Sequence, residues 1–142
     1  QDGAPFAGTS LGDALLVPTR IYVQAALAAH KLGLVRGLAH ITGGGLSNLL
    51  RLHDSLGYHI SDPLPSHPEF DWISKEGGVD IREMARTFNL GMGMVLVVTS
   101  DSADSVLGWL TEKLPGCAMV GEVRDHGRRV THIDERIEFD HY

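Results

Sequence analysis

The sequence of 142 residues has a single cysteine, Cys117, and only 12 lysines and arginines against 18 acidic residues. One cysteine cannot form a disulfide within the chain, so a reducing compartment and a cytoplasmic location are expected. The few basic residues are scattered, which argues against the basic face of a nucleic-acid-binding protein. No apolar run approaches the roughly 18 residues of a membrane-spanning helix, and no signal peptide is visible.

Two further features limit the possible functions. The histidines lack the spacing of zinc ligands, so no metal site is expected among His53, His59, His67, His126, His132 and His141. The first residue is Gln1 rather than methionine, which suggests a piece of a longer polypeptide. A chain of this length can form one domain that buries about 68–70% of its unfolded surface.

A glycine run at residues 40–45 (HITGGG) is the most informative stretch. A short apolar strand over residues 34–41 precedes it, and apolar residues at helical spacing over 46–53 follow it. This order is typical of phosphate-binding loops, because glycines let an anion approach the backbone and the first helical N–H groups lack intrahelical partners. The run lacks the lysine and hydroxyl of a P-loop and the third glycine of a dinucleotide motif, so a tight turn without a ligand is an equal alternative.

The remaining periodicities predict an α+β fold in which helices pack against a mixed sheet. Helices are expected from Pro18 to Gly33, from capping boxes at Ser66 and Asp80, and from Asp101 to Pro115.

Strands are expected over four further stretches. Residues 56–60 form a short one, and the valine-rich run at 92–98 is the candidate for a sheet centre covered on both faces. Residues 117–123 and 129–133 are expected to form a hairpin with a turn at 125–127.

The chain is expected to divide into three parts. Residues 1–12 form a linker or entry segment, because they are rich in small residues and lack periodicity. Residues 13–134 form the α+β domain. Residues 135–142 form a charged tail that should be exposed.

Three blocks together resemble one family, the phosphoribosylformylglycinamidine cyclo-ligases, also called aminoimidazole ribonucleotide synthetases. They are residues 15–23 (LLVPTRIYV), 39–46 (AHITGGGL) and 86–94 (RTFNLGMGM), with Phe70-x-Trp72-Ile73 between the second and the third. The resemblance covers the chain from about Leu11 to Ile133 and concerns only the C-terminal half of the family's enzymes.

The resemblance implies a reaction and its cofactors. ATP activates the formyl oxygen of formylglycinamidine ribonucleotide as a phosphate, and an amidine nitrogen displaces it to give aminoimidazole ribonucleotide, ADP and phosphate. Family members bind ATP and Mg²⁺ mainly through an N-terminal domain that also forms a homodimer interface. Nothing in this chain matches that domain, so the isolated chain is expected to be inactive.

The resemblance also implies roles for individual residues. Thr42 and the glycines Gly43, Gly44 and Gly45 correspond to the loop that holds the substrate phosphate. His40 would hydrogen-bond the substrate or assist a proton transfer, since its ordinary pKa lies near neutrality; the alternative is a strand histidine with a structural hydrogen bond. Further substrate-binding candidates, each with a structural alternative of capping, ion pairing or a β-bulge, are Thr19, Arg20, Asn89, Gly91 and Gly93.

Two other functions remain open from the sequence. The chain is also compatible with another ATP-dependent enzyme of the same superfamily, although the Pro-Thr-Arg-Ile-Tyr block favours the cyclo-ligase. A stand-alone phosphate- or nucleotide-binding module, with a regulatory role, is the third possibility.

Overall fold

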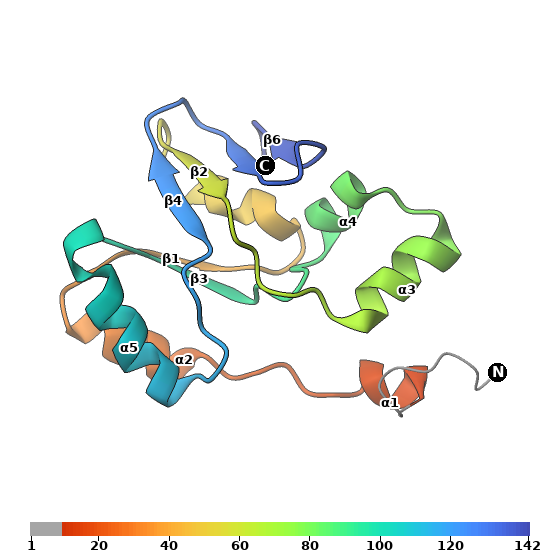
Figure 1. Cartoon of the computed structure of the whole chain (residues 1–142), viewed down its shortest axis with the longest axis horizontal. Helices are drawn as coiled ribbons and strands as arrows, with labels where there is room; N and C mark the ends of the chain where they lie inside the picture. Colours follow the sequence, from red (N-terminus) through yellow and green to blue (C-terminus); the bar gives the residue numbers. More distant parts are fainter. Residues whose placement is uncertain (1–9) are drawn as a thin grey trace.

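Two β-sheets with helices packed beside them make up residues 10–142, the part of the chain that this computed structural model describes (Figure 1). The α-helices are α1 (Leu11–Leu15), α2 (Val23–Lys31), α3 (Pro68–Gly77), α4 (Ile81–Thr87) and α5 (Ala103–Lys113), and the 3₁₀ helices are η1 (Gly45–Arg51) and η2 (Ser100–Ser102). The strands are β1 (Val35–His40), β2 (Gly57–Ile60), β3 (Met94–Val98), β4 (Gly121–Arg124), β5 (Val130–His132) and β6 (Glu138–Phe139). This architecture confirms the expected α+β class.

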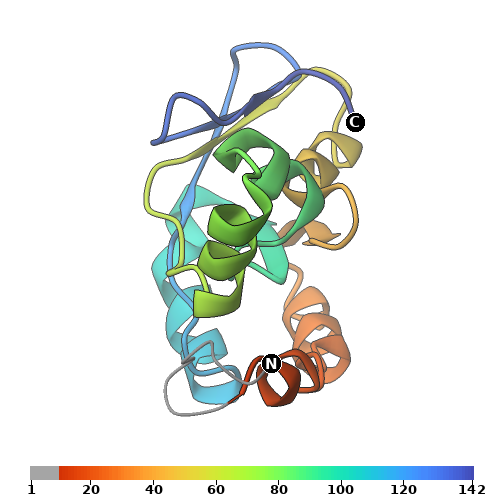
Figure 2. The same cartoon turned by 90° about the vertical axis from the view of Figure 1, so that its right-hand side faces the viewer.

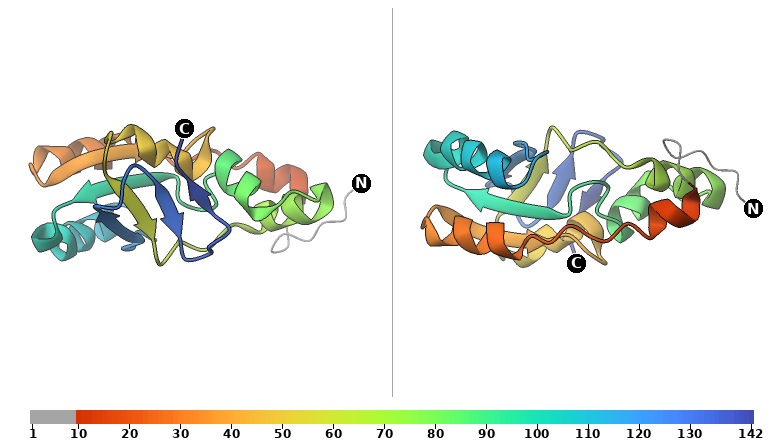
Figure 3. Two further views of the ribbon diagram at one scale, coloured as in Figure 1. Left: turned by 90° about the horizontal axis from the view of Figure 1, so that it is seen from above. Right: turned by 90° about the horizontal axis from the view of Figure 1, so that it is seen from below.

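The first sheet is a pair of antiparallel strands, β1 and β3, with Leu38 opposite Leu96. Helices α2 and α5 lie side by side against it, as the two views of Figure 3 show. A small core of Ala29, Val35, Val106 and Leu110 joins the helices to the strands.

Strand β3 was expected at the centre of a sheet, and this prediction is wrong for the described residues. Its only partner is β1, and all five of its residues are half-buried. The valine-rich pattern therefore reflects apolar surroundings on both faces, but it does not specify how many strands pair with β3.

The second sheet has the order β4-β2-β5-β6, so the predicted hairpin of β4 and β5 is also wrong. Strand β2 lies between them, antiparallel to β4 and parallel to β5. Strand β2 is thus an inner strand of this sheet, and three of its four residues are buried. The segment after β4 therefore crosses the end of β2 instead of folding straight back.

The main core lies between this second sheet and η1. Leu46, Leu49 and Leu50 pack there against Tyr58 and Val130. The C-terminal residues take part as well, because Ile137 and Phe139 are 2% and 1% exposed. The expectation of an exposed tail is thus wrong at these two apolar positions, which alternate with charged ones.

Several expected helix ends differ in the structure. Helix α2 begins at Val23 rather than Pro18, since Arg20 and Tyr22 are held in tertiary contacts before it. The capping box at Ser66 does not form, because Pro68 restricts His67 to an extended conformation and His67 becomes the N-cap. The box at Asp80 is confirmed, with its carboxylate accepting a hydrogen bond from the Glu83 N–H at 2.9 Å.

Two more boundaries differ from those expected from the sequence. The helix expected after the glycine run is a 3₁₀ helix that ends at Arg51, so His53 lies outside it. Of the predicted entry segment, residues 1–9 lie outside the described part of the chain, and Leu11 and Gly12 belong to α1. Helices α3 and α4 follow one another beside the sheets (Figure 2).

The burial of Phe139 gives a first prediction. Phe139→Ala should lower the free energy of unfolding by about 3–5 kcal/mol, because it removes a buried ring and leaves a cavity. Urea denaturation followed by circular dichroism measures the change. The control Ile133→Ala, at a side chain that is 64% exposed, should stay within about 0.5 kcal/mol. Equal effects of the two substitutions would contradict a core role for the C-terminal segment.

Candidate functional site

The glycine run forms a sharp turn between β1 and η1. Gly44 and Gly45 have φ values of 101° and 52°, in the left-handed region that favours glycine. The Gly45 N–H donates to the Thr42 carbonyl at 2.8 Å, and the Ser47 N–H donates to the Gly44 carbonyl at 3.1 Å. The turn therefore leads directly into a 3₁₀ helix.

Side chains from η1 bind the carbonyl oxygens of this turn. The Ser47 hydroxyl donates to the Gly44 carbonyl at 2.7 Å. The Asn48 side-chain amide donates to the Gly45 carbonyl at 2.7 Å, and its Oδ1 is buried without a hydrogen-bond partner among the described residues. Ser47 and Asn48 are both buried, so the inner side of the turn is fixed by the helix.

The outer side of the turn has free donors. Within residues 10–142, the amides of Gly43 and Gly44 donate no hydrogen bond. Gly43 is exposed, and a Cβ atom placed on it would meet nothing within 4 Å. The space beside Gly43 is therefore open to an anion, while Gly44 is half-buried against the Tyr142 ring.

Gly45 is needed for close packing as well as for its left-handed conformation. A Cβ atom on Gly45 would overlap the carbonyl oxygen of Ala85, in the last turn of α4. The backbone of the turn thus passes directly against this helix, and only glycine fits there. This contact fixes the position of the Gly43 and Gly44 amides relative to the core.

Arg51 and Tyr142 lie beside the loop, although the sequence did not indicate them. A Cβ atom on Gly44 would lie 3.0 Å from the Tyr142 ring, and the Arg51 guanidinium stacks over that ring at 3.8 Å from its centroid. Both side chains are exposed. Because the contact joins the end of η1 to the last residue of the chain, no local pattern predicts it.

His40 is the last residue of β1 and is exposed, opposite Met94. The ring of Tyr22 meets the His40 imidazole edge-on, with the ring centroids 5.9 Å apart. The Tyr22 hydroxyl in turn lies against Gly93, where a Cβ atom would clash with it. His40 is thus held close to the start of the glycine loop and open to solvent.

The Asn89–Gly93 segment forms a turn that supports this region. The Asn89 side chain accepts a hydrogen bond from the Gly91 N–H at 3.0 Å, and Leu90 and Gly91 have positive φ values. A Cβ atom on Gly91 would lie 2.4 Å from the Pro65 carbonyl oxygen. The Gly93 carbonyl accepts from the Ile41 N–H at 2.9 Å, which ties the turn to the strand before the loop. The close approach of the Pro65 backbone explains Gly91, and that of the Tyr22 side chain explains Gly93.

Among the described residues, Thr19 and Arg20 form no hydrogen bond or ion pair with this cluster. Arg20 donates from Nη1 to the Pro115 carbonyl at 2.9 Å, beyond the end of α5. Thr19 is exposed and precedes α2 without capping it. The structural alternative for Arg20, a tertiary anchor, is therefore the one observed.

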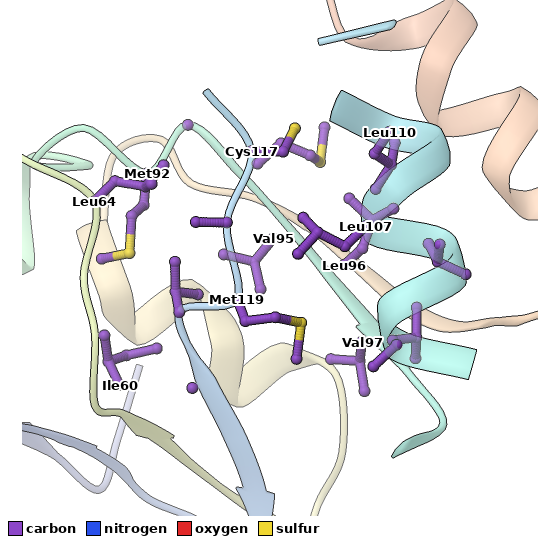
Figure 4. A pocket seen from close by; sticks show the side chains of 18 of the residues that line it. Ile60, Leu64, Met92, Val95, Leu96, Val97, Leu107, Leu110, Cys117 and Met119 are labelled. Atoms are coloured by element: carbon purple, nitrogen blue, oxygen red, sulfur yellow. The ribbon is translucent and has the colours of Figure 1, made fainter. Parts of the chain in front are cut away.

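A separate apolar cleft of about 470 Å³ opens between β3, α5 and residues 117–123. Figure 4 shows Leu64, Val95 and Met119 among its lining side chains. Burial raises the pKa of the Cys117 thiol in this wall, and the positive charge of Arg20 partly opposes the shift. The neutral thiol is thus favoured, in keeping with an apolar lining.

Mixed sheets, flanking helices and a glycine-rich turn from strand to helix place the chain among α+β domains. Residues 1–134 match the family model described as "AIR synthase related protein, C-terminal domain", and the chain belongs to this family. No helix in residues 10–142 is long and apolar enough to cross a membrane.

Two curated relatives carry the name phosphoribosylformylglycinamidine cyclo-ligase. The protein from Methanopyrus kandleri is 42% identical over 127 residues, which are 89% of this chain and 36% of the relative. The protein from Methanothermobacter thermautotrophicus is 44% identical over 131 residues, which are 92% of this chain and 38% of the relative. The chain thus spans less than two-fifths of the length of either protein.

The contact of Gly45 with α4 gives a second prediction. Gly45→Ala should lower the free energy of unfolding by about 1–3 kcal/mol, because the added methyl group forces the turn away from Ala85. Gly43→Ala is the matched control in the same loop and should change stability by less than about 0.5 kcal/mol. Chemical denaturation of both variants checks this, and a larger loss for Gly43→Ala would refute the described packing.

Proposed function

We propose that this chain is the C-terminal part of a phosphoribosylformylglycinamidine cyclo-ligase. The complete enzyme would convert formylglycinamidine ribonucleotide and ATP to aminoimidazole ribonucleotide, ADP and phosphate. Support comes from two relatives with this name at 42% and 44% identity. Because the chain spans only part of them, activity would require the remaining part of the enzyme, which we expect to form a homodimer.

Within this function, the glycine loop would bind the phosphate of the ribonucleotide. The observation that carries this proposal is the pair of unbonded amides at Gly43 and Gly44, on a loop whose carbonyl oxygens are bound by Ser47 and Asn48. Such a loop presents donors on its open side and fewer repelling oxygens. Arg51, stacked on Tyr142 next to Gly44, adds a positive charge in the same region.

His40 is the candidate for direct contact with the reacting part of the substrate. It is exposed at the end of β1, two residues before Thr42, and the edge of the Tyr22 ring supports its imidazole. An imidazole ring can both donate and accept a hydrogen bond, and it can take part in a proton transfer. Substrate bound by its phosphate at Gly43 would extend toward this side chain.

The ATP and Mg²⁺ of the reaction would be bound mainly by the part of the enzyme that this chain does not span. Mg²⁺ prefers carboxylate and phosphate oxygens. Among residues 10–142, no three His, Cys, Asp or Glu side chains converge in a way that could hold a metal ion. This part of the enzyme would therefore contribute substrate positioning, on which phosphoryl transfer strongly depends.

Phosphate binding can be tested on the chain itself. Addition of inorganic phosphate should shift the ¹⁵N–¹H resonances of Gly43 and Gly44, since their amides are the free donors of the loop. Gly33 and Gly127 serve as internal controls, because they are also exposed turn glycines with open space around them and lie outside the loop. Shifts of similar size at all four glycines, or none at the loop, would refute the assignment.

A substitution in the complete enzyme tests the role in catalysis. Gly43→Val should raise the KM for the ribonucleotide at least about tenfold, because its side chain occupies open space at the loop amides without touching the protein. The KM for ATP should stay nearly unchanged. Gly108→Val, on the exposed side of α5 with nothing near its Cβ, is the matched control. Equal increases in both KM values would count against a phosphate-specific loop.

A further inference from the structure

The apolar cleft beside β3 has two walls with unpaired backbone groups. One wall is the free edge of β3, and the other is the extended segment before β4 that contains Ala118 and Met119. Most of the lining side chains are aliphatic or contain sulfur (Figure 4), and Tyr22, Tyr58 and Glu122 also take part. The lining includes Tyr22 and Gly93, which support His40, but none of the loop residues 42–45.

The hydrogen-bond register shows which groups of β3 are free. The Ile41 N–H donates to the Gly93 carbonyl, so Ile41 and Gly93 form a hydrogen-bonded pair of the antiparallel ladder between β1 and β3. Hydrogen-bonded and non-hydrogen-bonded pairs alternate along an antiparallel ladder. Met94 and Leu96 belong to non-hydrogen-bonded pairs, so their N–H and C=O groups point away from β1. Within residues 10–142, no strand or loop pairs with them.

The opposite wall has the same property. The Val120 carbonyl accepts from the N–H groups of Ser61 and Asp62, but the amides of Ala118 and Met119 donate no hydrogen bond among the described residues. Both residues are exposed, and the Met119 side chain is directed into the cleft (Figure 4). Unpaired backbone groups thus occur on both sides of the cleft, and an added strand could pair with them.

We propose that this cleft binds a β-strand from the part of the cyclo-ligase that the chain does not span. Such a strand would pair with β3 on one side and with residues 118–119 on the other, and would join the two sheets into one. The relatives are long enough to contain such a strand, because the matched region makes up only 36% and 38% of their length. The proposal shares with the proposed function only the premise of a longer enzyme and does not depend on phosphate binding.

Other occupants fit the walls less well. A small apolar ligand would fill the volume but leave the backbone groups of Met94 and Leu96 unpaired. A second copy of the chain that paired through its own β3 would meet only one of the two walls. Of these three occupants, only a strand from the remaining part of the enzyme could pair with both walls, as in other cases of strand addition.

Amide hydrogen exchange tests this directly. The isolated chain is compared with a full-length polypeptide in which the upstream part of the Methanothermobacter relative precedes it. The amides of Met94 and Leu96 should exchange at least about 100-fold more slowly in the full-length polypeptide. The amides of Val95 and Val97 face β1 and should be protected in both. Equal exchange of Met94 and Leu96 in the two polypeptides would overturn the proposal.

A variant locates the contact. Met119→Lys should abolish the added protection in the full-length polypeptide, because a charge would enter the cleft. It should leave the isolated chain folded, since Met119 is 45% exposed there. Ile133→Lys, at an exposed side chain outside the cleft, is the control and should retain the protection. Retained protection in Met119→Lys would overturn the proposal. A dimer of the isolated chain that dissociates on this substitution would also overturn it, because the cleft would then bind a second copy of the chain.

Discussion

The contact between the Gly45 backbone and the Ala85 carbonyl is the constraint on which the rest of this region depends. Any side chain at Gly45 would overlap the end of α4. Because the chain can pass so closely, η1 enters the core and places Leu46, Leu49 and Leu50 against the second sheet. The same turn leaves the Gly43 and Gly44 amides without a hydrogen-bond acceptor among the described residues. Packing and the proposed binding site are therefore consequences of one backbone approach.

The turn at Asn89–Gly93 extends this arrangement to the first sheet. Gly91 lies against Pro65, Gly93 lies against Tyr22, and the Gly93 carbonyl receives the Ile41 N–H. The fold requires glycine at these two positions even without a ligand, because another part of the chain occupies the space of each missing side chain. His40 is positioned by the same contacts, through Tyr22.

Features with a local cause could be predicted from the sequence. The glycine turn, the strand before it, the Asp80 cap and α5 all follow from side-chain spacing and turn chemistry. Features that depend on distant partners could not. The insertion of β2 between β4 and β5 and the stacking of Arg51 on Tyr142 join residues far apart in the chain. Likewise Arg20 looked suited to phosphate, but its partner is a carbonyl beyond α5.

The position of β3 connects the two proposals. Its sequence has the continuous apolar pattern of a central strand, yet only β1 pairs with it in the described residues. A strand in the cleft would give β3 a second neighbour. It would also hold Gly93, which precedes β3 and binds Ile41 just before the glycine loop. An isolated pair of strands is only marginally stable in water, so completing the sheet would fix the loop amides more firmly. Substrate positioning by the glycine loop would then depend on the remaining part of the enzyme, even if that part does not contact the phosphate.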